Sequence, residues 1–190
     1  MLSFILFGFL GYRYSHWIHK HQYVLYGLAT MLLTLGLLLN IEPLTSGELS
    51  IGFFMIVMFA GSLPPKTTLS KRLRSIRKEY SITGFILASI HALYFLFEGQ
   101  LAWVGIITYI LMISLTIISL DQVRRKITAK TWKNIQKAAY PIYLGLWIHI
   151  MLMGEFAFSI PFAIYLVMKI RFEWQKVKQK RLRMILKTES

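Results

Sequence analysis

Long apolar runs separated by short basic loops constrain the fold of this chain more than any other feature of its sequence. A helix that crosses a hydrocarbon core of about 30 Å needs roughly 20 mainly apolar residues. Six runs are predicted as such helices, and they cover Tyr23–Ile41, Leu49–Leu63, Tyr80–Phe97, Leu101–Leu120, Ala138–Gly154 and Phe156–Met168. Hydrophobic residues make up 56% of the chain, above the roughly 45–50% of soluble domains. We therefore predict an all-α integral membrane protein built as a six-helix transmembrane bundle.

The charges in the connections predict how this bundle is oriented. The loops Glu42–Glu48 and Glu98–Gln100 contain no Lys or Arg, whereas the loops at the opposite ends of the runs are rich in both. Because positive loops stay on the cytoplasmic side, both termini are predicted to be cytoplasmic in a multi-pass protein of the plasma membrane. The net charge of +14 is then a consequence of topology, and no nucleic acid partner is expected.

Two terminal segments flank the predicted bundle, which covers residues 23–168. Residues 1–22 begin with the apolar run Met1–Gly11, which is too short to cross the bilayer and is expected to be interfacial or partly inserted. A tilted seventh span is the alternative for this segment. Residues 169–190 mix basic and apolar residues, which is typical of a juxtamembrane tail on anionic lipid.

His91 and His149 are the candidate functional residues, because each interrupts an apolar run. His91 follows Glu79 by twelve residues and His149 follows Lys137 by twelve, so both imidazoles are expected roughly 18 Å from the cytoplasmic boundary. Ionisable residues at such depth usually hold a ligand or line a cavity. The chain has no cysteine, which leaves histidine as the strong metal ligand. Two histidines at one level of two co-directional helices predict a shared ligand, for which haem iron is favoured over zinc.

Several segments resemble the ferric-reductase-like transmembrane haem domain family, which includes NADPH oxidase and ferric reductase membrane cores and the haem-binding subunit of a bacterial methionine sulfoxide reductase system. The resemblance extends over roughly Leu49–Met168. It depends on the segments Arg72–Tyr80, Ser119–Arg125, Trp132–Gln136 and Tyr140–His149, together with His91. The resemblance implies a b-type haem between the third and fifth spans, with His91 and His149 as axial ligands to its iron.

The chain departs from the two-haem members of that family at the cytoplasmic level. Where such members carry inner histidines, this sequence has Lys78 and Gln136, so one haem is expected and a second would need other ligands. His16, His19 and His21 are the candidates for such an inner site, or for contact with a quinone headgroup. An interfacial loop is the simpler interpretation of these three histidines.

The resemblance implies a protein that transfers electrons across the membrane, as an oxidoreductase or as an electron-transfer subunit. The sequence contains no glycine-rich dinucleotide motif, so the expected donor is quinol or a separate reductase that carries flavin. The expected acceptor is an extracytoplasmic partner protein or metal ion. The alternative is a haem-free transport or assembly subunit, in which the two histidines form a proton relay or an interhelical hydrogen bond.

Overall fold

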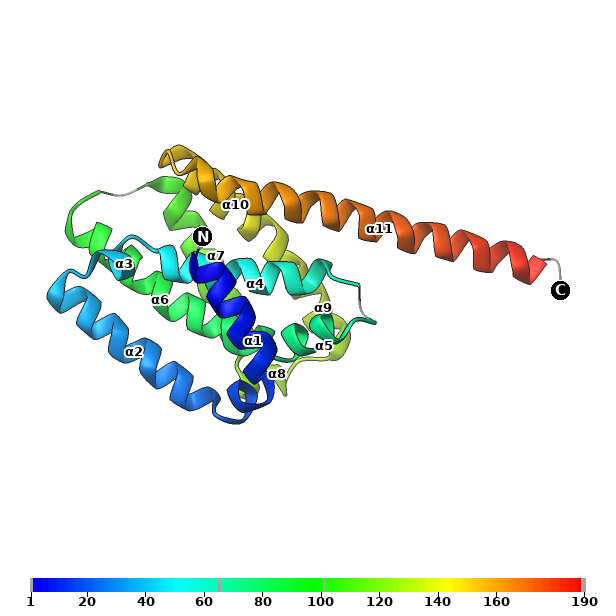
Figure 1. The fold of residues 1–190 in the computed structure, drawn as a ribbon, viewed down its shortest axis with the longest axis horizontal. Coiled ribbons are helices and arrows are strands. Elements are labelled where there is room, and N and C mark those ends of the chain that lie inside the picture. Colours follow the sequence, from blue (N-terminus) through cyan, green and yellow to red (C-terminus); the bar gives the residue numbers. More distant parts are fainter. Residues whose placement is uncertain (1, 65, 101, 189–190) are drawn as a thin grey trace.

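The computed structural model describes residues 2–64, 66–100 and 102–188, and every regular element in these residues is helical. Seven longer helices form the body of the molecule (Figure 1). They are α1 (Leu2–Lys20), α2 (Gln22–Leu39), α4 (Glu48–Ser62), α6 (Arg77–Phe97), α7 (Trp103–Ser119), α10 (Ala139–Leu152) and α11 (Ser159–Thr188). Short helices connect them: α3 (Glu42–Thr45), α5 (Thr68–Ser75), α8 (Asp121–Arg124), α9 (Ala129–Ile135), and the 3-10 turns Gln136–Ala138 and Phe156–Phe158. The all-α prediction agrees with this structure.

The predicted six-span bundle is wrong. Within the described residues, only α2 and α6 are long and apolar enough to cross a membrane, and this criterion alone is weak evidence for spanning. Helices α4 and α7 have 15 and 17 residues, or about 22 and 26 Å at 1.5 Å per residue, which is short of a full crossing. Hydropathy located these apolar segments but could not show where each helix would end.

The last two predicted spans also differ from the structure. The fifth is shortened to the 14 residues of α10, because a 3-10 turn precedes the helix and a turn follows it. The sixth is not a separate segment, because α11 continues as one helix of 30 residues from Ser159 to Thr188. The start predicted for the fourth span, Leu101, lies outside the described residues, and α7 begins at Trp103.

Helix α4 lies at the centre of the molecule. It packs against α1 and α6 on one side and against α11 on another. Its residues are apolar around the whole circumference, as expected for a helix enclosed by others. Phe53, Ile56 and Val57 belong to a cluster shared with α1, α2 and α6, whereas Met55 and Met58 pack with Ile150, Phe158, Phe162 and Tyr165 near α10 and α11.

The amino-terminal segment forms a kinked helix against this core. Helix α1 has non-helical backbone angles at Tyr14 and packs on α4 and α5. Gly11 allows close contact, because a Cβ atom there would lie 2.8 Å from Ile76 Cδ1. Residues well beyond the apolar run Met1–Gly11 therefore take part in this helix.

Arg74 closes the carboxyl end of α4. Its Nε donates to the Ala60 carbonyl at 3.0 Å and its Nη2 to the Leu63 carbonyl at 2.8 Å. Burial, and then the nearby charge of Arg77, lower the pKa of the Arg74 guanidinium, but an arginine remains protonated at neutral pH. A cation at a helix carboxyl end also interacts favourably with the helix dipole.

We expect Arg74→Met to destabilise the protein by about 1–2 kcal/mol, because two carbonyl groups lose a charged donor. The exposed neighbour Lys71 provides the matched control, and Lys71→Met should leave stability nearly unchanged. Thermal unfolding followed by circular dichroism in one detergent measures both effects. Equal losses in the two variants would contradict this role of Arg74.

Candidate haem site

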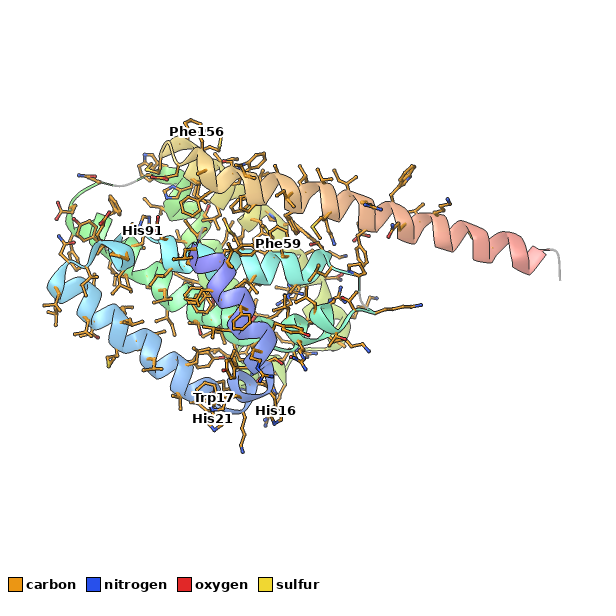
Figure 2. All side chains as sticks on the ribbon, viewed as in Figure 1. His16, Trp17, His21, Phe59, His91 and Phe156 are labelled. Atoms are coloured by element: carbon orange, nitrogen blue, oxygen red, sulfur yellow. The ribbon has the colours of Figure 1, made fainter. Side chains whose placement is uncertain are left out.

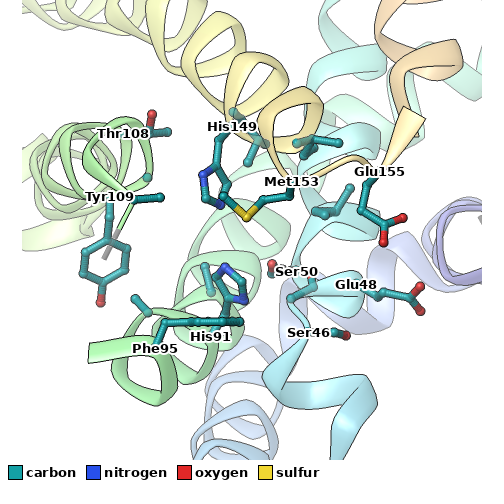
Figure 3. A pocket seen from close by; sticks show the side chains of 18 of the residues that line it. Ser46, Glu48, Ser50, His91, Phe95, Thr108, Tyr109, His149, Met153 and Glu155 are labelled. Atoms are coloured by element: carbon teal, nitrogen blue, oxygen red, sulfur yellow. Dashed lines mark hydrogen bonds between the residues drawn. The ribbon is translucent and has the colours of Figure 1, made fainter. Parts of the chain in front are cut away.

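The structure brings His91 and His149 together from two helices that run in the same direction. Arg77 in the first turn of α6 lies beside Tyr143 near the start of α10, and further along the same two helices the imidazole rings of His91 and His149 meet. Their ring centroids are 6.0 Å apart and their planes are inclined by 75°. Figure 3 shows the two rings pointing toward one another across a cavity.

His91 is held by the short helix that precedes α4. Its Nδ1 lies 2.9 Å from the Thr45 carbonyl oxygen. Since a carbonyl only accepts, Nδ1 must carry the proton, and the lone pair of Nε2 is left available for a ligand. A hydrogen bond from the nitrogen that faces away from the ligand also fixes the orientation of a metal-binding imidazole.

Gly47 makes this contact sterically feasible. It has φ of 82°, and a Cβ atom there would lie 3.2 Å from both Cγ and Nδ1 of His91. Only glycine adopts this backbone conformation without strain and leaves the space into which the imidazole fits.

His149 lies against a second glycine. A Cβ atom on Gly105 of α7 would be 3.0 Å from Cε1 and 3.2 Å from Nδ1 of His149. The Nδ1 atom of His149 is buried and has no hydrogen-bond partner among the described residues. Buried polar atoms without partners are rare enough to require an explanation, and this one lies beside the same cavity.

The cavity has a volume of about 1010 Å³, at the upper end of the range for ligand pockets. Its walls come from α3, α4, α6, α7 and α10. The apolar part includes Ile51, Phe54, Ala88, Ala92, Phe95, Ile106, Met112, Leu146 and Ile150. Three carboxylates, Glu42, Glu48 and Glu155, also line it, and Figure 3 places two of these, Glu48 and Glu155, on one side of the histidine pair.

Two aromatic side chains, Phe95 and Tyr109, are held in fixed positions in the cavity wall beside the histidines. The Phe95 ring lies 4.8 Å from the His91 ring. Tyr109 stacks on Phe85 and donates to the Ser89 hydroxyl at 2.8 Å, while Ser89 donates to the Phe85 carbonyl. Because this hydroxyl network is paired on both sides, Tyr109 is fixed at the cavity edge.

The candidate inner-site residues do not converge on one centre. His19 pairs with Glu79 at 2.8 Å, and His21 bonds the Trp17 carbonyl and stacks on its indole. Lys78 pairs with Asp121, whereas His16 is exposed and Gln136 is half-buried. Figure 2 shows His16 and His21 where α1 meets α2, far from His91.

Three residues of the site were not anticipated from the sequence: Thr45, Gly47 and Gly105. The segment Thr45–Glu48, with Ser46 and Gly47 between, carried a turn signal, but only the fold places that turn beside His91. Gly105 lies inside an apolar run without any local signal of a close approach.

The chain is similar in sequence to a protein of a spirochaete. An uncharacterized protein of Treponema pallidum (strain Nichols) is 31% identical over 134 residues, which cover 60% of this chain and 36% of the relative. The chain thus spans about a third of the length of that protein. No family model matches the chain. No solved structure matches it.

Proposed function

We propose that this chain is a membrane protein that binds a b-type haem through His91 and His149 and transfers electrons between the two sides of the plasma membrane. The separation of 6.0 Å between the two imidazole centroids carries this proposal. Imidazole nitrogens bind first-row metals at about 2 Å, and a ring centre lies about 1 Å behind its nitrogen. Two axial imidazoles on one iron therefore have centroids about 6 Å apart.

The surroundings of the two rings fit the same group. The Thr45 carbonyl leaves the His91 Nε2 lone pair available, and the inclination of 75° between the rings is compatible with axial ligands on opposite faces of a macrocycle. The mainly apolar wall of the cavity suits a porphyrin, while Gly47 and Gly105 leave space beside both rings. When bound, haem supplies a one-electron iron couple. The role of this chain is to bind, orient and shield that couple.

The exposed faces of the helices support a location in the membrane. On α2, Val24, Leu28, Met31, Leu35 and Leu38 are exposed, and on α7 Ile107, Ile110, Leu111 and Ile117 are exposed. Such continuous apolar surfaces are rare on soluble monomers. Contact with lipid accounts for them without requiring every helix to cross the bilayer fully.

The carboxylates of the cavity favour a cationic or positively charged acceptor. Glu42, Glu48 and Glu155 line the same cavity as His91 and His149, so a positively charged acceptor that enters this cavity would be attracted by their negative charge. The donor in this proposal is quinol or a separate flavin reductase, at the side of the membrane where the Lys- and Arg-rich loops lie. The resemblance to the ferric-reductase-like family belongs to the same proposal.

The geometry favours this function over a haem-free transport or assembly subunit. Two imidazoles joined by a direct hydrogen bond of about 2.9 Å would have centroids roughly 5 Å apart, closer than the 6.0 Å here. The distance between the rings therefore suits a metal ion bound by both imidazoles better than a direct hydrogen bond between them.

The proposal is tested by adding haem to the purified full chain and recording oxidised and dithionite-reduced spectra. We expect saturation at one haem per chain and a low-spin reduced spectrum with separate α and β bands. Saturation at two haems per chain would establish an inner site. No spectral change in folded protein would favour the haem-free alternative.

A further inference from the structure

We propose that α11 forms a parallel two-stranded coiled coil with α11 of a second copy of this chain, so that the protein is a homodimer. The starting observation is the spacing of exposed apolar residues along this helix. Ile160, Ala163, Val167, Ile170, Trp174 and Val177 follow one another at intervals of three, four, three, four and three residues, and all six are exposed. This is the alternation of positions a and d in a heptad repeat.

The exposed stripe lies on the side of α11 that does not contact the rest of the molecule. Phe162 and Tyr165 are the residues that pack into the core beside Met55 and Ile150. Beyond Lys169, which contacts the Tyr140 ring at 5.1 Å, the helix extends away from the body (Figure 1). The carboxyl-terminal half of the stripe therefore has no partner surface within the described part of the chain other than its own helix.

The exposed fractions are large for this kind of side chain. Val167 is 66% exposed, Ile170 61% and Trp174 78%. These three residues, with Arg171 and Lys178, line a shallow groove on the helix. A groove of this form can accept an apolar side chain from a facing helix.

Charged residues flank the stripe in a pattern that complements a second copy. With Val167 and Trp174 at a, the positions beside the stripe place Glu173 at g and Lys178 at e. In a parallel dimer each g residue lies near the following e residue of the other helix, so Glu173 and Lys178 would pair twice by symmetry. Glu173 already bonds Lys169 of its own helix at 2.8 Å, and a carboxylate can accept from both.

The width of the stripe favours a helix partner over a lipid surface. A helix lying on lipid exposes a broad apolar arc of 100° or more, whereas a strict a and d stripe is narrower. Nearer the core, Ile164 and Leu166 are also exposed and widen the apolar face. Beyond Lys169 the stripe is narrow, because Arg171 and Lys178 border one side of it and Glu173 the other. If the helix lay flat on anionic lipid, Arg171 and Lys178 would reach the headgroups favourably, but the Glu173 carboxylate would be held beside like charge.

The first test uses the absence of cysteine from the chain. Val177→Cys places a thiol at position d, and mild oxidation of the full chain in nanodiscs should yield a disulfide-linked dimer. The exposed Gln175 lies two residues earlier, about 200° around the helix, and Gln175→Cys should cross-link at least about fivefold less. Equal cross-linking of the two variants, or none, would overturn the proposal.

The second test reverses the flanking charges. We expect the full chain to have a protein mass of two copies by light scattering, Glu173→Lys to halve it, and Glu173→Lys/Lys178→Glu to restore it. A mass of one chain throughout contradicts the dimer. If in addition a spin label on Val177→Cys contacts the lipid of anionic vesicles, the stripe is a lipid-binding face. Neither result depends on haem binding.

Discussion

Replacing either His91 or His149 by glycine should abolish the low-spin spectrum of the haem-loaded protein. In the proposed site, the two imidazoles, with centroids 6.0 Å apart, would both bind the haem iron, so one substitution would leave a single protein ligand. We expect high-spin haem or loss of haem in both variants, with an affinity lower by at least about tenfold. Absorbance titration of haem into each purified variant measures the effect.

Two controls separate ligation from damage to the fold. His16→Gly removes an exposed histidine outside the cavity, and its spectrum should remain unchanged. Imidazole added to His91→Gly or His149→Gly should refill the space of the lost ring and restore the low-spin bands. If either histidine variant keeps the parent spectrum without imidazole, that residue is not an axial ligand.

The second large effect is expected at Gly47, because its backbone has a positive φ and its missing side chain leaves room for the His91 ring. Gly47→Ala places a side chain at φ of 82° and brings its Cβ atom 3.2 Å from the His91 ring. Backbone strain should cost about 1–2 kcal/mol of stability. Displacement of the imidazole from its bond to Thr45 should weaken haem binding by about 10–100-fold.

Gly99 is a matched control for this effect. Its φ is 70°, but among the described residues, its chain neighbours aside, no atom lies within 4 Å of where its Cβ would be. Gly99→Ala should therefore lose similar stability while haem affinity stays at the parent value. Thermal unfolding and haem titration of both variants give the two quantities separately, and similar losses of haem affinity would show that Gly47 acts only through backbone strain.

Together these results would place His91 at the centre of the site. Its Nδ1 donates a hydrogen bond of 2.9 Å to the Thr45 carbonyl, and its ring lies against Gly47 and Phe95. His149 lacks a partner for its Nδ1 among the described residues. The two ligands would thus differ in rigidity, and His149 would be the one that moves first when the cavity is perturbed.

The sequence by itself determined that the fold is helical and which two residues form the candidate site. Apolar runs of this length favour helices whatever they pack against, and an imidazole at an equal distance along two co-directional helices predicts a common level. The same pattern could not fix helix ends. The run around His149 was shortened by turns on both sides, and the last run continued as the 30 residues of α11.

Only the tertiary structure decided what surrounds the histidines. The His91 bond to Thr45 joins residues 46 positions apart in the chain, and Gly105 reaches His149 from a different helix. Contacts of this kind depend on how helices pack, which no local pattern encodes. The structure also shows that His16, His19 and His21 do not share a ligand site. His19 pairs with Glu79, and His21 bonds the Trp17 carbonyl.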